Sequence, residues 1–340
     1  MDIVSEFAPV RVHAILRAAS LAASEALRLA CAVVTGGAGF IGSSLVRALL
    51  EQGDTVRVVD DFSTGYRANL GTISDEVELH EVSICDTDGL APVFRGADVC
   101  YHQAALPSVL QSVVDPLGTH QANVAGTLNV FIACRNAGVH RVVYASSSSV
   151  YGNATEMPVH EAMPLCPISP YAAGKASIEL YARTFSDLYD VELVGLRYFN
   201  VFGPRQDPNS HYSAVIPIFV RCMLKGERPV VYGDGHQSRD FTYVANAVSA
   251  NILAGSHAGR LSGVFNVACG RTLSLVAMIG HLNTILGTSL EPEFAPARPC
   301  DVQRSLADIS RARDAFGYEP VVHIEEGLQQ TLLWYAGNAR

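Results

Sequence analysis

The sequence predicts an α/β protein: a doubly wound, mostly parallel sheet with a smaller C-terminal substrate-binding lobe. Two observations predict this class. Short β-rich runs alternate with helical stretches up to residue 197, and the pattern beyond is broken by proline and glycine. Strand–helix alternation favours parallel strands joined by right-handed crossovers. With 340 residues and 49% apolar content, the chain is long enough to bury such a sheet.

The expected elements follow from hydrophobic periodicity. Helices are expected at residues 41–51, 121–136 and 171–188. The expected strands are residues 29–35, 55–60, 77–82, 99–102, 141–146 and 192–197, with a further run at 263–268 that would return to the sheet. The predicted division is an N-terminal extension, expected to be helical, at 1–28, a dinucleotide-binding domain at 29–197, and mainly a substrate lobe at 198–340.

Charge and cysteine content restrict the partners of the protein. The net charge of −9 disfavours nucleic acid and anionic membrane surfaces. Arg17, Glu25 and Arg28 interrupt the apolar N-terminal stretch, so no membrane span is expected. The eight cysteines contain no C-x-x-C pair and no Cys/His spacing typical of zinc. We therefore expect no metal site, and free thiols in a reducing, cytoplasmic environment.

A glycine-rich segment follows the first expected strand. Residues 35–42 read Thr-Gly-Gly-Ala-Gly-Phe-Ile-Gly and lead into the first expected helix. Glycines there permit a tight turn and the close approach of a pyrophosphate, which free N–H groups at the helix start can bind. The segment predicts a Rossmann-type dinucleotide site with contacts from Gly36, Gly39, Phe40, Ile41 and Gly42.

An acidic residue at the end of the second expected strand indicates which dinucleotide binds. Asp60 lies 18 residues after Gly42, where its carboxylate would bond a ribose diol and repel a 2′-phosphate. NAD is therefore favoured over NADP. The alternatives are FAD, which nothing else in the sequence supports, and a glycine turn with an unrelated surface acid.

A tyrosine and a lysine are spaced by four residues at the start of the third expected helix. Tyr171 and Lys175 share one helix face. A phenol titrates near pH ~10, and a nearby ammonium lowers its pKa by favouring the phenolate. The expected strand at 141–146 runs into Ser147-Ser148-Ser149, and a serine at this strand end can hydrogen-bond a substrate oxygen. The set predicts proton transfer by Tyr171, although the pair alone also fits a surface aromatic beside a solvated lysine.

These motifs resemble the extended short-chain dehydrogenase/reductase family over residues 29–335. Within it, the chain is similar to the NAD-dependent sugar-nucleotide epimerases, most of all the bacterial UDP-N-acetylglucosamine and UDP-glucose 4-epimerases. The stretches that carry this narrower resemblance are residues 198–208, 214–217, 233–235, 238–241 and 305–309.

The resemblance implies a role for each catalytic and cofactor-binding residue. Ser147 and Tyr171 would contact the sugar O4, and Lys175 would contact the NAD ribose. Ser83 and Ile84 stand where the family binds adenine, although Ser83 replaces an acid that is usual there. Hydride would move from sugar C4 to NAD while Tyr171 takes the hydroxyl proton. The resulting 4-keto sugar would turn over and take the hydride back on its other face.

The resemblance also assigns the substrate end. Asn200, Arg239 and Arg298 would hold the UDP diphosphate, giving an acidic protein local donors for an anionic ligand. Ser305 stands where galactose-type epimerases commonly have a tyrosine, and would leave room for a 2-acetamido group. UDP-GlcNAc and UDP-GalNAc are therefore expected substrates, with UDP-Glc and UDP-Gal also turned over. The alternative is that Ser305 has no influence on the choice of sugar.

Four other functions remain as alternatives. A sugar-nucleotide 4,6-dehydratase needs an acid/base pair where this chain has Ser148 and Ser149. A UDP-glucuronate epimerase or decarboxylase lacks an evident carboxylate-binding pattern here. A net reductase would release NAD at each turnover, and the intact catalytic set disfavours a non-catalytic NAD-binding regulator. The resemblance further implies a homodimer through a four-helix bundle, with 121–136 and 171–188 as candidate helices, although core packing requires apolar stripes too.

Overall fold

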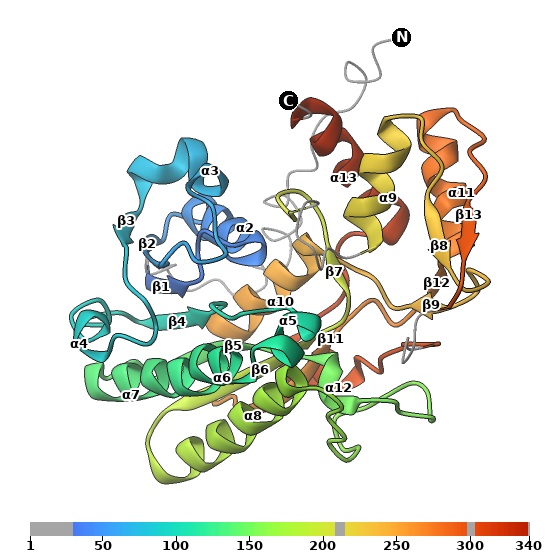
Figure 1. Ribbon diagram of the computed structural model, residues 1–340. Coiled ribbons are helices and arrows are strands. Elements are labelled where there is room, and N and C mark those ends of the chain that lie inside the picture. Colours follow the sequence, from blue (N-terminus) through green and yellow to red (C-terminus); the bar gives the residue numbers. More distant parts are fainter. Residues whose placement is uncertain (1–29, 208–214, 298–302, 339–340) are drawn as a thin grey trace.

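The computed structural model describes residues 30–207, 215–297 and 303–338, so the extension at 1–28 lies outside the described residues. A seven-stranded sheet with parallel pairings forms the centre, in the order β11-β6-β5-β4-β1-β2-β3 (Figure 1). The doubly wound α/β fold predicted from the sequence is confirmed. In sheet order the strands are Gly263–Val267, Glu192–Tyr198, Arg141–Ser147, Val99–His102, Cys31–Thr35, Thr55–Val59 and Glu78–His80.

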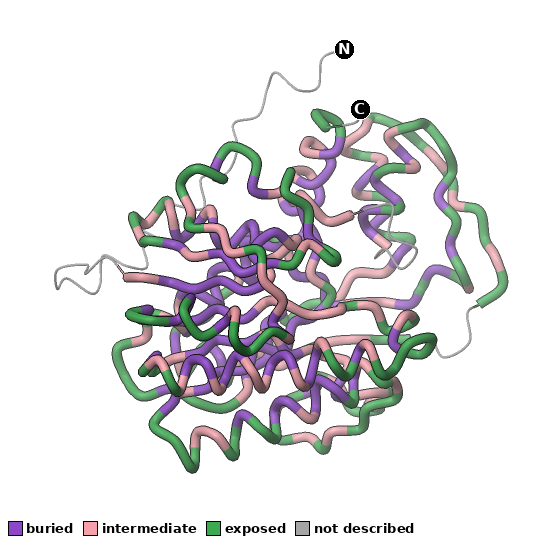
Figure 2. Tube along the Cα trace, turned by 60° about the vertical axis from the view of Figure 1, so that its left-hand side comes forward, coloured by how far each residue is buried: buried purple, intermediate pink, exposed green. Residues whose placement is uncertain are grey.

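Helices cover both faces of the sheet, which is why its strands are apolar on both sides. Along β1, Ala32 and Val34 pack into one core and Val33 into the other, because successive side chains point to opposite faces. Figure 2 shows the strands as a buried layer between helices whose outer sides are exposed. The main helices are α2 (Phe40–Glu51) and α10 (Val244–Ser256) on one face, and α7 (Thr127–Ala137) and α8 (Pro170–Leu188) on the other.

The substrate lobe has a core of its own. Phe219, Met278 and Leu328 belong to one buried cluster, which joins the three long helices of the lobe. These helices are α9 (Val215–Leu224), α11 (Leu275–Leu286) and α13 (Ile324–Asn338), beside the paired strands β8 (Val230–Tyr232) and β13 (Glu293–Ala295). The lobe stands beside the sheet and is linked to it through α10 and the edge strand β11 (Figure 1).

Short elements complete the chain. Two further two-stranded pairs connect the lobe to the sheet: β7 (Val201–Phe202) with β10 (Thr242–Tyr243), and β9 (Ser238–Arg239) with β12 (Leu273–Ser274). The remaining helices are α3 (Arg67–Leu70), α4 (Thr87–Leu90), α5 (Val109–Val114), α6 (Pro116–His120) and α12 (Ser310–Phe316), and the 3-10 turns are Gly71–Glu76 and Ser148–Tyr151. No helix within the described ranges is long and apolar enough to cross a bilayer.

The expected helix at 121–136 begins differently from a regular α-helix. Residues Gln121–Gly126 form a π-helical segment that runs into α7. The buried Asn123 lies in this segment, and its side chain accepts from Leu106 N (2.7 Å) and donates to Leu106 O (2.9 Å). π-helical segments often occur at functional sites. This one fixes the loop that follows β4, which lines the pocket described below.

Strand order decides where a ligand can bind. The chain winds from β1 toward β3 on one side and from β4 toward β6 on the other, so the order reverses between β1 and β4. Ligands of such sheets bind outside the carboxyl ends of the strands at this point. The two strand ends are joined there by buried His102, whose Nδ1 lies 2.6 Å from Thr35 Oγ1 and whose Nε2 lies 2.8 Å from Thr127 Oγ1.

Candidate active site

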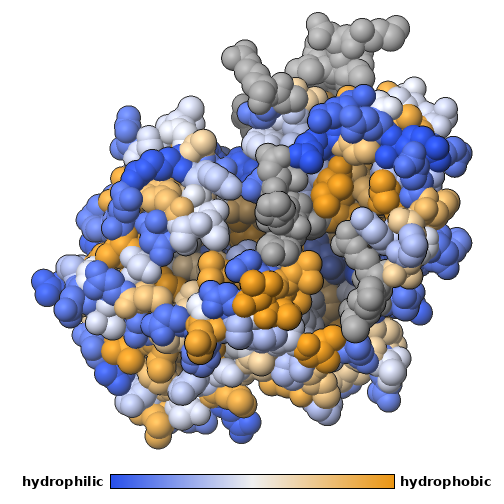
Figure 3. Space-filling model, viewed as in Figure 1, coloured by the Kyte–Doolittle hydropathy of each residue, from blue (hydrophilic) through white to orange (hydrophobic). Residues whose placement is uncertain are grey.

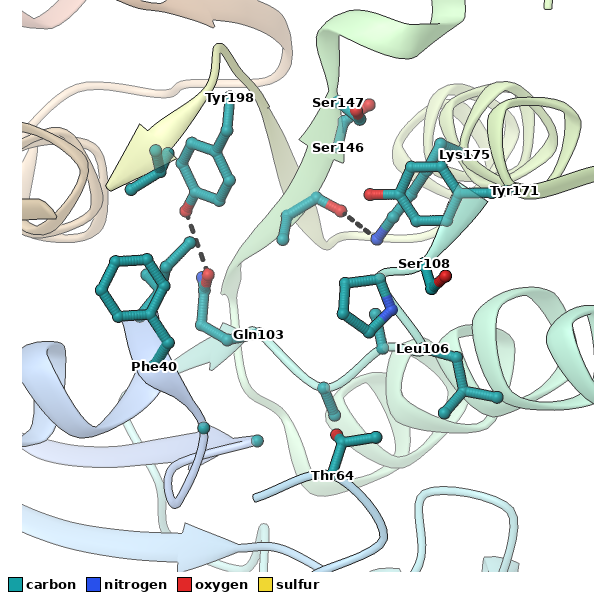
Figure 4. Close-up of a pocket in the computed structure, with 18 of the residues that line it drawn as sticks. Phe40, Thr64, Gln103, Leu106, Ser108, Ser146, Ser147, Tyr171, Lys175 and Tyr198 are labelled. Atoms are coloured by element: carbon teal, nitrogen blue, oxygen red, sulfur yellow. Dashed lines mark hydrogen bonds between the residues drawn. The ribbon is translucent and has the colours of Figure 1, made fainter. Parts of the chain in front are cut away.

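A cavity of about 1100 Å³ opens at the carboxyl ends of the sheet strands. Its walls come from the glycine-rich loop, the ends of β5 and β6, the start of α8 and the substrate lobe. Figure 4 shows Phe40 and Tyr198 on one side of the cavity and Tyr171 and Lys175 on the other. The cavity is large enough for a dinucleotide and a second ligand together.

The glycine-rich loop forms a cradle that side chains would fill. Gly36 has φ +69°, and a Cβ there would lie 2.6 Å from Ala104 N. A Cβ on Gly42 would lie 2.0 Å from Gly36 O. The N-cap of α2 is Gly39, and no side chain caps this helix start. The loop therefore offers its backbone to a pyrophosphate, and the fit to a dinucleotide is direct.

Asp60 has a structural task as well as the predicted ligand contact. Its Oδ2 accepts from Ala38 N and its Oδ1 from Phe62 N, each at 2.8 Å, so it ties the glycine-rich loop to the end of β2. Burial raises its pKa, and these two bonds partly oppose the rise. The side chain also lines the cavity. A carboxylate oxygen has more than one lone pair, so a ribose hydroxyl still finds an acceptor.

The neighbouring Asp61 is a cavity residue that the sequence reasoning missed. Burial would raise its pKa, but hydrogen bonds from Ser63 and Ser83 hold the pKa below its ordinary value. Ser83 thus supports a second acid in the part of the cavity wall that also contains Ile84. The acid that the family usually carries at Ser83 is absent, yet this neighbour places a carboxylate in the same wall.

Helix α8 begins at the residues predicted to be catalytic. Ser169 is its N-cap and accepts from Ala172 N at 3.1 Å, and Pro170 occupies the first turn. Both are favoured at helix starts, because the cap satisfies a free N–H and proline has none to lose. Tyr171 N donates to Ser112 Oγ (3.1 Å), which anchors this start to α5. The first turn of α8 is therefore held rigidly over the cavity.

The three predicted catalytic residues meet in one wall of the cavity. The Ser147 side chain, at the end of β5, lies close enough to the Tyr171 phenol to lower its pKa. Lys175 Nζ lies 5.8 Å from the centroid of the Tyr171 ring and donates to Ala145 O at 2.7 Å, the bond dashed in Figure 4. The geometry brings together a proton-transfer group, a hydroxyl partner and a buried cation.

The pKa values explain what each member contributes. Burial raises the pKa of Tyr171, and the nearby Ser147 side chain lowers it in part. The effect of the Lys175 ammonium on the phenol stays a prediction. Burial lowers the pKa of Lys175 to about 8, while the charge of Glu179 opposes this. The ammonium is therefore present below about pH 8 and is lost above it.

The substrate end of the cavity is assembled from three segments of the lobe. Asn200 Nδ2 donates to Asp240 O (2.9 Å) and lies 3.4 Å from Ser305 Oγ. The buried Asp240 carboxylate accepts from the backbone of Cys269, Gly270 and Ala307, and burial raises its pKa to about 6. These bonds bring Asn200, Arg239 and Ser305 to the cavity together. Arg298 lies outside the described residues.

Other cavity residues escaped the sequence reasoning. Arg205 and Arg304 add two cations to the cavity wall, and Tyr198 donates to Gln103 Oε1 at 3.1 Å across it. Tyr66 donates to Asp207 Oδ2 (2.9 Å), which joins the β2 side to the lobe over the cavity. Arg205, Tyr198 and Arg304 lie in or beside the stretches that carried the family resemblance, so the signal was present for those three.

The fold and the site define an NAD-binding enzyme of the extended short-chain dehydrogenase/reductase type. A scan against family models matches residues 32–268 to "NAD dependent epimerase/dehydratase family". The chain belongs to this family, and NAD is its cofactor.

Named relatives agree with this class. The chain is 40% identical to a UDP-glucose 4-epimerase of Mycolicibacterium smegmatis, over 91% of this chain and 99% of that protein. It is 32% identical to a UDP-glucuronate 4-epimerase of Thermodesulfobacterium geofontis, over 90% and 96%. The solved UDP-N-acetylglucosamine 4-epimerase of Methanobrevibacter ruminantium M1, in complex with UDP-N-acetylmuramic acid, superposes with a TM-score of 0.88 at 41% identity, covering 92% of this chain and 100% of that one.

Proposed function

We propose that this protein is an isomerase that inverts C4 of UDP-hexoses. The observation that carries the proposal is the shared cavity: Tyr171, beside Ser147, faces the same space as the glycine cradle for NAD. A base beside a retained hydride acceptor is what oxidation and re-reduction of one carbon require.

In this proposal each residue has one task. Tyr171 takes the proton of the sugar 4-hydroxyl and later returns it, while Ser147 hydrogen-bonds the same oxygen. Lys175, as an ammonium within about 6 Å of the phenol ring, favours the phenolate. When bound, NAD supplies a reversible hydride acceptor, held by the loop of Gly36, Gly39, Phe40, Ile41 and Gly42 and by Asp60, Ser83, Ile84 and Lys175.

The substrate is held by its diphosphate and left free at its sugar. Asn200 and Arg239 line the cavity, and Arg205 and Arg304 add charge to its walls. Guanidinium groups bind phosphate through paired donors. Arg298 belongs to this set as a prediction. A ligand tethered at one end lets the 4-keto sugar present either face to the same hydride acceptor.

For the sugar itself we propose UDP-GlcNAc and UDP-GalNAc, with UDP-Glc and UDP-Gal also turned over. Ser305 lines the cavity, and its small side chain leaves space where a 2-acetamido group would lie. Ser305→Tyr should abolish turnover of the acetylated pair and spare the plain pair. Acetylated sugars that react in this variant as well as before would refute the role of Ser305.

The test of the function is product analysis without added NAD. The purified protein is incubated separately with UDP-GlcNAc, UDP-Glc and UDP-glucuronate, and the products are identified by NMR. C4 epimers of the first two support the proposal. A 4-keto-6-deoxy product, an epimer of UDP-glucuronate alone, or no product would refute it. The glucuronate arm matters because one relative carries that name.

We also propose a homodimer. The apolar side chains of α7 face the core, as buried Val130 and Phe131 show, so α7 is less suited to a bundle than expected. Large apolar side chains are instead exposed on α5, α6 and α8, and Figure 3 shows apolar surface gathered over α5. They are Val109, Leu110, Val113, Val114, Leu117, Leu180, Tyr181 and Leu188. We propose that a second copy of the chain covers this patch in a homodimer. Sedimentation of the purified chain as a monomer would refute the dimer.

A further inference from the structure

A buried ion pair lies between helix α8 and strand β6, outside the cavity. Glu179 on α8 and Arg197 on β6 bond in a bidentate way, with Arg197 Nε to Oε1 at 2.9 Å and Nη2 to Oε2 at 2.7 Å. Both side chains are nearly inaccessible, at 5% and 3% exposure. A buried pair of this kind is weak evidence for stability, because desolvating two charges offsets their attraction. We therefore looked to the reaction for the role of the Glu179–Arg197 pair.

The position of Glu179 connects it to both catalytic elements. It follows Lys175 by one helical turn, as Lys175 follows Tyr171. Ser146 Oγ donates to Glu179 Oε1, and Lys175 Nζ donates to Ala145 O. Helix α8 thus holds the end of β5 at two successive residues, and the next residue is Ser147. Glu179 itself does not line the cavity.

Among the charged groups around Lys175, Glu179 acts on the lysine through its charge and not through a direct ion pair. Glu179 is the charged neighbour that raises the lysine pKa against burial. His102, from β4, is neutral near pH 7, because burial and then the charge of Lys175 lower its pKa to about 3. The groups that face this region are Tyr171 and Glu179 on α8, His102 on β4, Tyr144 on β5, Tyr151 on the turn after β5, and Arg197 on β6.

Arg197 fixes the Glu179 carboxylate in place. Besides its two bonds to Glu179, Arg197 Nη1 donates to the Tyr151 hydroxyl (2.7 Å), which donates to Asn266 Oδ1 (2.7 Å). Asn266 in turn donates to Asp308 O at 3.0 Å. The carboxylate of Glu179 is thereby held by Ser146 on β5 and by Arg197 on β6, which is itself fixed through Tyr151.

We infer that Glu179 is a positioning residue of the reaction: held by Arg197, it keeps Lys175 charged and fixes the strand end that carries Ser147. This inference rests on the proposed 4-epimerase function. Removing its charge makes Lys175 neutral at a lower pH, because the negative charge of Glu179 stabilises the ammonium. With less ammonium beside it, the Tyr171 phenol ionises at a higher pH.

The experiment compares Glu179→Gln with Glu192→Gln in the NAD-loaded enzyme. Glu192 pairs with Arg141 at the starts of β6 and β5, which are the ends away from the catalytic residues. Glu192→Gln therefore breaks a Glu–Arg pair as Glu179→Gln does, but at a distance from the catalytic residues. Two readouts are taken: the pH profile of kcat, and the ultraviolet titration of the Tyr171 phenolate, obtained as the difference from Tyr171→Phe. The second readout needs no substrate.

Glu179→Gln should move the alkaline limb of the kcat profile to lower pH by about 1 unit or more. It should also raise the pKa at which the Tyr171 phenol titrates, with KM unchanged. Glu179→Asp keeps the charge, so its kcat profile and its phenol titration should both lie close to those of the wild-type enzyme. Glu192→Gln should lower stability and shift neither. Glu179→Gln that behaves like Glu192→Gln in both readouts overturns the inference.

Two further outcomes stay decisive. If Glu179→Gln does not fold, the double variant Glu179→Gln/Arg197→Met removes both buried charges, a change that is often tolerated. The same shifts are expected there, and unshifted curves overturn the inference. If the wild-type enzyme epimerises no UDP-sugar, the proposed function fails, while the phenolate titration still decides the part played by Glu179.

Discussion

Replacing Gly42 by alanine should cost the protein its cofactor more than its fold. The added Cβ would lie 2.0 Å from Gly36 O, 2.8 Å from Gly36 C and 2.9 Å from Gly37 Cα, all backbone atoms that cannot rotate away. Carbon contacts are comfortable at about 3.5–4.0 Å, so the loop and the start of α2 must separate by more than about 1 Å. Such overpacking costs about 1–3 kcal/mol. If the whole of this strain opposes NAD binding, the affinity for NAD falls by about 5- to 150-fold.

Gly280→Ala is the matched control. Gly280 lies in helix α11, is exposed, and a Cβ there meets nothing within 4 Å. The substitution should stabilise the helix by up to about 1 kcal/mol and leave NAD binding unchanged. The assay is the NAD content of each purified variant with its thermal unfolding curve. Equal NAD content and equal unfolding temperature in Gly42→Ala and Gly280→Ala would refute the reasoning.

Three further predictions concern the catalytic set. Tyr171→Phe should lower kcat by about 10²–10⁴-fold with an unchanged circular dichroism spectrum, and a rate within a few-fold of wild type would remove Tyr171 from the mechanism. Ser147→Ala removes the side chain that lowers the pKa of Tyr171, so the acid limb of the pH profile should move to higher pH; an unmoved limb contradicts this. In the wild-type enzyme the Lys175 ammonium is lost as pH rises through about 8, so kcat should fall there, and a flat profile to pH 10 would argue against a role for that charge.

The sheet could be predicted because its strands carry their own signal. Strands buried on both faces read as continuous apolar runs, so β1, β4, β5 and β6 were found within two residues of their ends. The short pairs of the lobe carry no such signal. β9 and β12 are two residues long, lie 34 residues apart at their nearest ends, and exist only because the lobe folds around them.

The catalytic wall was predictable for a similar reason. Ser147 stands at a strand end and Tyr171 at a helix start, and both places are marked locally in the sequence. The Asp61–Ser83 contact and the Glu179–Arg197 network depend on how segments distant in the sequence pack together. A local sequence pattern therefore could not predict them. The effect of burial on the Tyr171 phenol was likewise beyond the sequence, because it depends on the surrounding elements.

In the proposed reaction, the hydrogen removed from C4 returns to the same carbon within the site. The direct measurement is epimerisation of UDP-GlcNAc or UDP-Glc in D₂O, with the product examined by NMR at C4. A hydride held by the enzyme does not exchange with solvent, so the account predicts epimerised product without deuterium at C4. Deuterium at C4 of the product would mean that the hydrogen leaves as a proton, and would contradict the account.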